Sequence, residues 1–168
     1  MSKLSLDTPI QSGPHSLYWH ASEGRDWSLP SFKSLESMKT LGDWHSRLAE
    51  LGIDSLSDGM FFLMRDPIPP LWENAKNVYG GAYSFRILKR DAGRAFETYA
   101  TAMMDGDVTV DPANRINGLS ISPKKTHNII KVWNTDSTVF NKPSDLLKLW
   151  PDMALEDILY TPFTQKKM

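Results

Sequence analysis

The chain of 168 residues contains no cysteine. This absence excludes disulfide bonds, thiolate metal sites and a cysteine nucleophile. The sequence also lacks an apolar run near the roughly 20 residues that cross a membrane as a helix. Its first residues, Met1-Ser2-Lys3-Leu4-Ser5, lack the apolar core of a signal peptide. These absences predict a cytoplasmic protein with no membrane partner, and they are compatible with passage through the nucleus.

Neither sign of charge is in excess, since Lys and Arg number 19, Asp and Glu number 20, and the net charge is −1. A protein that grips long RNA mainly through its phosphates would usually be basic. We therefore expect any nucleic-acid ligand of this chain to be short, or to be recognised at its end.

Recognisable enzyme motifs are missing as well. The four histidines, His15, His20, His45 and His127, do not have the spacing of metal ligands. The chain has neither a Gly-x-Ser-x-Gly nucleophile motif nor a glycine loop that could cradle phosphates. No pair of carboxylates forms a recognisable acid–base site. We expect a binding protein that catalyses no reaction and holds no cofactor or metal ion.

What the chain does contain is the composition of a soluble globular protein, with 40% hydrophobic and 23% charged residues. Its length is most simply that of one domain with a real core. Residues 1–13 are polar and include Pro9 and Gly13, so we expect a flexible N-terminal arm followed by a single domain over residues 14–168.

Short strand patterns alternate with three helical patterns along this domain. Strands are expected near 17–20, 60–64, 83–88, 118–122, 128–133 and 158–160, helices over 41–51, 91–105 and 145–150, and a loop over 21–37. Thr40 and Asp43 form a capping box at the first helix, and Trp19 is expected in the strand core. We predict an α+β domain in which an antiparallel sheet carries about three helices on one face and leaves the other face open to a ligand.

Trp72 stands beside Glu73 in a polar segment that follows three prolines, where an ordinary core residue would be badly placed. An indole can stack on a flat base while the carboxylate accepts hydrogens from the edge of guanine. Trp27, in a loop rich in Gly, Ser and Pro, is a candidate for the second ring of a clamp. The alternative is an indole that folds back onto the domain. If both indoles reach one site, the ligand is a flat and cationic base.

Alternation along the hairpin of residues 118–133 separates its side chains into two sets. Ile130 and Val132 share the core face with Leu119 and Ile121. The other face collects Ser120, Ser122, Lys124, Lys131 and Trp133. This polar face suits an aromatic, phosphorylated ligand; the alternative is a solvated face with one exposed indole.

Together these features resemble the mRNA cap-binding translation initiation factor 4E family. The resemblance covers about residues 8–140 and depends on Thr8-Pro9-Ile10-Gln11, Trp27, the run Ile68 to Asn77, Gly80-Gly81 and the hairpin from Gly118 to Trp133. It implies a curved sheet with three helices on its convex back and a cap pocket on its concave side. It also implies that Trp27 and Trp72 stack on 7-methylguanine, that Glu73 holds the guanine edge and that Trp133 lies near the methyl group.

The chain departs from this family where the cap phosphates would bind. Lys124 stands in place of an arginine, Ile129 in place of a lysine, and Ala82 in place of another arginine. The candidates that remain for the phosphates are Lys124, Lys125, Lys131 and Arg25.

The resemblance further implies that a helical scaffold or repressor protein binds the back of the sheet. Pro9, Ile10 and Leu41 are expected in that surface. The family's tryptophan in the first helix falls on Trp44 when residues are counted from Trp27, and on His45 when the helix starts are matched. Partner choice is therefore expected to have diverged, and the protein is expected to be a monomer.

The expected function is binding of the 7-methylguanosine cap of mRNA in translation initiation. Two alternatives stay open. One is a cap-binding repressor whose back face no longer recruits an initiation scaffold. The other is an interaction adaptor whose cap pocket has lapsed, which Ile129 and Ala82 suggest and the retained Trp27, Trp72 and Glu73 oppose.

Overall fold

The computed structural model describes residues 8–21, 26–52, 60–151 and 157–164. Its two α-helices are α1 (Leu41–Leu51) and α2 (Lys89–Met104). Its seven strands are β1 (His15–His20), β2 (Lys33–Met38), β3 (Met60–Arg65), β4 (Gly81–Leu88), β5 (Ile116–Pro123), β6 (His127–Asn134) and β7 (Leu159–Pro162). Neither helix is long and apolar enough to cross a bilayer, among the residues described.

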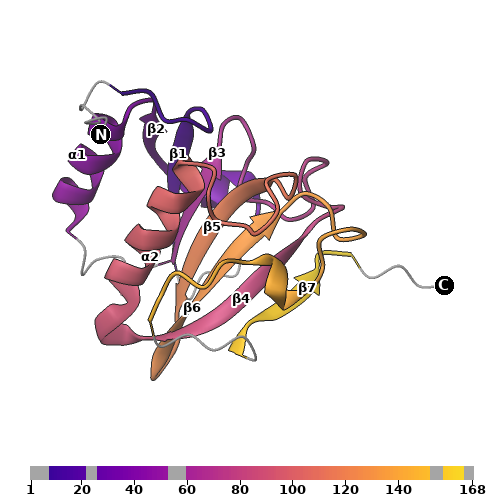
Figure 1. Ribbon diagram of the computed structural model, residues 1–168. Coiled ribbons are helices and arrows are strands. Elements are labelled where there is room, and N and C mark those ends of the chain that lie inside the picture. The colour runs from indigo at the N-terminus through magenta and orange to yellow at the C-terminus, as the bar shows by residue number, and fades with distance from the viewer. Residues whose placement is uncertain (1–7, 22–25, 53–59, 152–156, 165–168) are drawn as a thin grey trace.

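All seven strands belong to one antiparallel sheet in the order β2-β1-β3-β5-β6-β4-β7. The sheet is curved, and α1 and α2 lie on the same side of it (Figure 1). The predicted α+β class and antiparallel sheet are therefore confirmed. The capping box of α1 is also present, because Thr40 Oγ1 accepts from the Asp43 backbone N–H and the Asp43 carboxylate accepts from the Thr40 N–H.

The strands bury one face against the helices. This main core contains Leu17, Leu63, Leu119, Ile121, Ile130 and Val132 from the strands and Trp44, Phe96, Tyr99 and Met103 from the helices. A second, smaller cluster lies on the opposite face. It contains the alternate strand residues Phe62, Met64, Ala82 and Trp133, joined by Phe32 and Ile68 from the connections before β2 and after β3. Period-two alternation thus gives the sheet a helix-covered face and an apolar floor on its open face.

The prediction of a third helix over residues 145–150 is wrong. Only a short 3-10 turn forms, at Pro143–Asp145. The following residues use their backbone groups outside the segment: Leu146 bridges to Thr109, and Leu147 N–H donates to Val108 O at 3.1 Å. Pro143 and Pro151 leave too few residues between them for a helix to compete with these contacts.

Three further predictions need correction at the N-terminal side. The loop expected over 21–37 contains strand β2, an edge strand whose Lys and Ser residues hid it. The predicted flexible arm is packed from Thr8 onward, where Ile10 is buried and donates its N–H to Lys39 O at 3.0 Å. Residues 1–7 lie outside the described residues. Trp19, expected in the core, is 38% exposed.

Asn134, the last residue of β6, is buried and ties three strands together. Its Oδ1 accepts from Gly81 N of β4 at 3.0 Å and from the Tyr160 hydroxyl of β7 at 2.8 Å. Its Nδ2 donates to Asn114 Oδ1 at 3.0 Å and to Phe140 O at 2.9 Å. Burial raises the pKa of Tyr160, so its hydroxyl remains a neutral donor. The network fixes β7 against β4.

We expect Asn134→Ala to lower the free energy of unfolding by at least about 2 kcal/mol, because it leaves several buried donors and acceptors without partners. Urea denaturation measures this loss. Asn141→Ala is the matched control, since the Asn141 amide is exposed and makes a single bond, to Ser137 O. It should cost no more than about 0.5 kcal/mol. Equal losses in the two variants would contradict the role given to Asn134.

Candidate functional site

A cavity of about 510 Å³ opens on the sheet face opposite the helices. Its wall brings together most of the residues singled out from the sequence: Trp27, Trp72, Glu73, Ser120, Ser122, Lys131 and Trp133. These residues come from the β1–β2 connection, the β3–β4 connection and the β5–β6 hairpin, so they meet only in the folded chain.

Trp27 forms one side of the cavity, with its side chain 46% exposed. Its indole stacks on the buried imidazole of His20, with ring centroids 4.0 Å apart and planes 2° from parallel. His20 does not line the cavity, whereas Trp27 does. The imidazole therefore backs the indole and leaves its other face free.

His20 is itself fixed at both ring nitrogens. Nδ1 lies 2.8 Å from Ala21 O and Nε2 lies 2.7 Å from Asp26 O. Phe32 packs against the imidazole at 4.7 Å, tilted by 56°. Directly before Trp27, the Asp26 carboxylate accepts hydrogen bonds from the Ser28 backbone N–H at 2.9 Å and from the Ser28 hydroxyl at 2.7 Å, and these bonds lower the pKa of Asp26. The orientation of Trp27 is thus set by a buried neighbour that the sequence pattern did not indicate.

Trp72 and Glu73 lie in a run of turns between β3 and β4, and both side chains are exposed, Trp72 to 46%. The buried Asn77 side chain stabilises this run by donating to Pro69 O at 3.1 Å and to Leu71 O at 2.9 Å. Asn117 on β5 donates to Asn77 Oδ1 at 3.0 Å and joins the loop to the sheet. The loop therefore presents the indole and the carboxylate from a fixed base.

Phe163 is an aromatic wall that sequence analysis missed. Its ring lies 6.5 Å from Trp72 at an interplanar angle of 28° and 5.1 Å from Trp133 at 62°. Its N–H donates to Gly80 O at 3.0 Å, which seats the end of β7 beside the cavity. The sequence signal nearest to it was the short strand expected at residues 158–160, which gave no register to place Phe163.

Trp133 belongs to the floor of the cavity. It is only 6% exposed, and its Nε1–H donates to Ser120 Oγ at 3.2 Å. Phe62 packs edge-on against it at 6.1 Å and 84°. The alternative of an exposed indole on a solvated face does not describe this residue.

The basic residues divide into two groups. Lys131 lines the cavity, and partial burial together with the charge of Lys124 lowers the pKa of its ammonium group. Lys124 and Lys125 are exposed at the hairpin turn and do not line the cavity. Arg25 lies outside the described residues. Ala82, opposite Trp133 in the β4–β6 ladder, is buried in the floor.

The residues expected on the partner surface behind the sheet are only partly displayed. Trp44 is 1% exposed and Ile10 is buried as well, so both belong to the core, which corrects their assignment to a binding surface. Pro9 and His45 are exposed, and Leu41 is half-buried. Side chains of successive helix residues point about 100° apart. Because the Trp44 side chain points into the core, the His45 side chain next to it is exposed to solvent.

The family model described as Eukaryotic initiation factor 4E matches residues 17–165 of this chain. The chain belongs to the eukaryotic initiation factor 4E family. Every residue named above as lining the cavity lies inside the matched range.

Two plant translation initiation factors share part of the sequence. The eukaryotic translation initiation factor NCBP of Arabidopsis thaliana is 35% identical over 86 residues, which are 51% of this chain and 37% of that protein. The NCBP of Oryza sativa subsp. japonica is 30% identical over 76 residues, 45% of this chain and 33% of that protein. The matches thus span about a third of the length of each relative.

Solved structures of initiation factor 4E proteins share the fold. The schistosome protein complexed with m7GpppA and 4E-BP has a TM-score of 0.69 at 20% identity, over 80% of this chain and 75% of that one. The Ascaris suum eIF4E-3 complex with m7G cap has a TM-score of 0.63 at 17% identity, over 77% and 74%. At this identity the likeness establishes the fold alone.

The His20–Trp27 stack makes a prediction about the free protein. His20→Ala removes the ring behind the indole, so acrylamide should quench Trp27 fluorescence more strongly. The Trp27 contribution is the difference between each protein and its Trp27→Phe counterpart. His45→Ala, which removes an exposed histidine on α1, is the matched control and should leave quenching unchanged. Equal quenching in the His20→Ala and parent proteins would contradict the support given to Trp27.

Proposed function

We propose that this protein binds the 7-methylguanosine cap of mRNA and acts in translation initiation. The observation that carries the proposal is one cavity that contains two half-exposed indoles, Trp27 and Trp72, and the exposed carboxylate of Glu73. Similar folds have been solved with m7G cap and with m7GpppA, and two relatives are named translation initiation factors.

The chemistry of the cap explains why this cavity suits it. Methylation at N7 makes guanine cationic, and a cation between two electron-rich indole faces gains both stacking and cation–π attraction. Trp27 offers a face whose other side is already occupied by His20. Binding the base therefore requires little reordering of this ring, which lowers the entropic cost of association.

Glu73 supplies base identity. Guanine presents N1–H and an exocyclic amine on one edge, and a carboxylate can accept both in a charge-assisted pair. Adenine presents a ring acceptor where guanine has N1–H, so the carboxylate would face a lone pair. The apolar floor made by Trp133 and Phe163 suits the methyl group of the base.

The adaptor alternative, in which the cap pocket has lapsed, fits the cavity less well. A lapsed pocket has no reason to keep the two indoles and the carboxylate around one cavity. One structure of the same fold contains both m7GpppA and 4E-BP, and another, of C. elegans eIF4E-3, contains both a cap analogue and the 4E-binding protein Mextli. We propose that a helical partner docks on the back of this protein near Pro9, Leu41 and His45, with His45 in place of a tryptophan.

Retention on an immobilised 7-methylguanosine nucleotide tests the proposed function. The protein should be retained, eluted by free 7-methylguanosine triphosphate and not by GTP or ATP at the same concentration. Failure of the folded protein to be retained, or elution by all three nucleotides alike, would reject cap recognition.

Trp27→Ala and Trp72→Ala should each weaken cap binding by about 1–3 kcal/mol, roughly ten- to hundredfold, because each removes one stacked ring. Fluorescence titration with a cap analogue measures the affinity. Trp19→Ala is the control, since Trp19 is exposed but does not line the cavity. The sandwich is wrong if the Trp27 and Trp72 variants bind as tightly as the parent.

Glu73→Gln should cause a large loss of cap affinity with the fold intact. The change replaces one acceptor oxygen with a donor that faces the N–H groups of guanine, and the Glu73 side chain is exposed, so no core packing is lost. Isothermal titration gives the affinity, and circular dichroism checks the fold. Unchanged affinity would remove guanine-edge recognition from this residue.

A further inference from the structure

Arg86 lies in the same cross-strand row as Ser122, which lines the cavity of about 510 Å³ between Trp27 and Trp72. In the β4–β6 ladder it is opposite Ile129, and in the β5–β6 ladder Ile129 is opposite Ser122. Directly paired residues of antiparallel strands project their side chains to the same face. Ser122 lines the cavity. Arg86 therefore projects from the open face, two strands away from Ser122.

The spacing of the sheet puts Arg86 within reach of a ligand that extends from the cavity. Neighbouring strands are about 4.7–4.9 Å apart, and diagonal neighbours are about 7–8 Å apart. Lys131, which lines the cavity, pairs with Ser84, so Arg86 is its diagonal neighbour on β4. A polyphosphate chain that extended from the bound base past Lys131 would meet Arg86 next.

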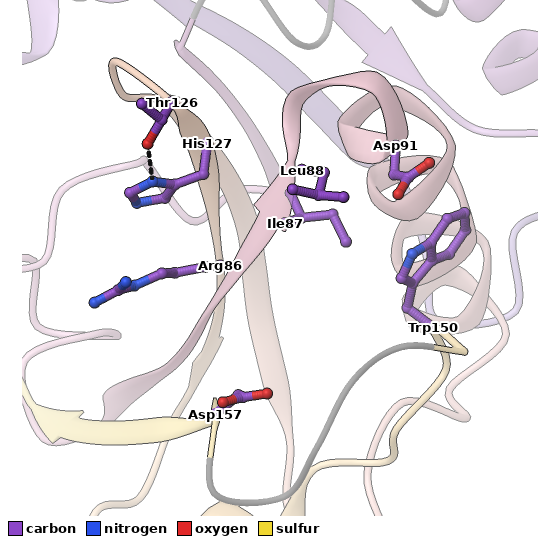
Figure 2. Close-up of a pocket in the computed structure, with 8 residues that line it drawn as sticks. All are labelled: Arg86, Ile87, Leu88, Asp91, Thr126, His127, Trp150 and Asp157. Atoms are coloured by element: carbon purple, nitrogen blue, oxygen red, sulfur yellow. Dashed lines mark hydrogen bonds between the residues drawn. The ribbon is translucent and has the colours of Figure 1, made fainter.

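A second cavity, of about 410 Å³, contains Arg86 together with Thr126 and His127 of the hairpin. Figure 2 shows the Arg86 side chain projecting from β4 on the side of His127, away from Asp91 of α2 and from Trp150. The guanidinium thus projects on the same side of β4 as the His127 imidazole.

The Arg86 guanidinium is available for an anion. It is exposed, and among the described residues it forms no ion pair with Asp91 or Asp157, which line the same cavity. Arg47, by contrast, pairs with Glu50, and Arg65 donates to Asn117. Lys131 is the diagonal neighbour of Arg86 across the ladder. Its pKa is lowered by burial and by the charge of Lys124, so an anion beside these two lysines would relieve their repulsion.

We infer that Arg86 binds a phosphate group of the ligand, at the distal end of a polyphosphate whose base occupies the Trp27–Trp72 cavity. The inference rests on the proposed function and adds a residue that the sequence analysis did not single out. Ile129, at the centre of the row, cannot contact a phosphate. The neighbouring strand supplies the cation instead, and a guanidinium can bind a phosphate through two parallel N–H bonds.

The test compares 7-methylguanosine with its mono-, di- and triphosphate in isothermal titrations of four proteins: the parent, Arg86→Ala, Arg86→Lys and Arg94→Ala. Arg86→Ala should weaken triphosphate binding about three- to tenfold and leave nucleoside binding within about twofold. Arg86→Lys should recover part of the loss. Arg94→Ala removes an exposed arginine on α2 and should change neither affinity.

Unchanged triphosphate affinity in Arg86→Ala would overturn the inference, and so would an equal loss for nucleoside and triphosphate, which indicates a structural effect. If the parent protein binds no 7-methylguanosine, the proposed function fails, and inorganic tripolyphosphate then decides about Arg86. Weaker tripolyphosphate binding by Arg86→Ala supports the inference, whereas equal binding by parent and variant overturns it. A smaller salt dependence of triphosphate binding in Arg86→Ala is the second readout, because it reports a lost charge contact.

Discussion

The register of the antiparallel sheet is the constraint on which the site depends. Side chains alternate along each strand, so a slip of one residue on β6 would turn Trp133 and Lys131 into the core and expose Val132. Two glycines that neighbouring strands approach closely, and the hydrogen-bond network of Asn134, fix this register. A Cβ on Gly118 would lie 2.3 Å from Met64 Sδ, and one on Gly81 would lie 2.5 Å from Thr161 O. Asn134 then joins β6 to β4 and β7 through buried hydrogen bonds.

The two sides of the proposed clamp are held by different means. Trp27 is oriented by a stacked, buried imidazole whose nitrogens lie against backbone carbonyls. Trp72 sits on a turn segment that the buried Asn77 amide fixes, with Phe163 beside it. Neither indole depends on the other for its placement, so each can contribute its own stacking energy. Because both rings are held in place before binding, a flat ligand that stacks on them requires little reordering of the site.

Sequence reasoning reached the parts of the fold where local signals and tertiary structure agree. The capping box of α1 and the alternation of the β5–β6 hairpin are such signals, and they placed Lys131, Ser120 and Trp133 on one face. Sequence reasoning failed where long-range pairing decides. Strand β2 is a polar edge strand, and the segment after Pro143 bonds to the loop near Thr109 instead of coiling. His20, Phe163 and Arg86 could not be found because their positions depend on contacts and registers that no spacing in the sequence specifies.

Recognition of a methylated, cationic base between Trp27 and Trp72 is tested most directly by fluorescence titration of the protein with 7-methylguanosine and, separately, with unmethylated guanosine. The two ligands have the same guanine edge for Glu73 and differ only in the methyl group and the positive charge. We expect both nucleosides to quench tryptophan fluorescence and the methylated one to bind at least about tenfold more tightly. The reason is that the cation–π attraction of a desolvated cation between two indoles contributes about 2 kcal/mol or more to binding. Equal affinity for the two nucleosides, or no binding of either, would contradict it.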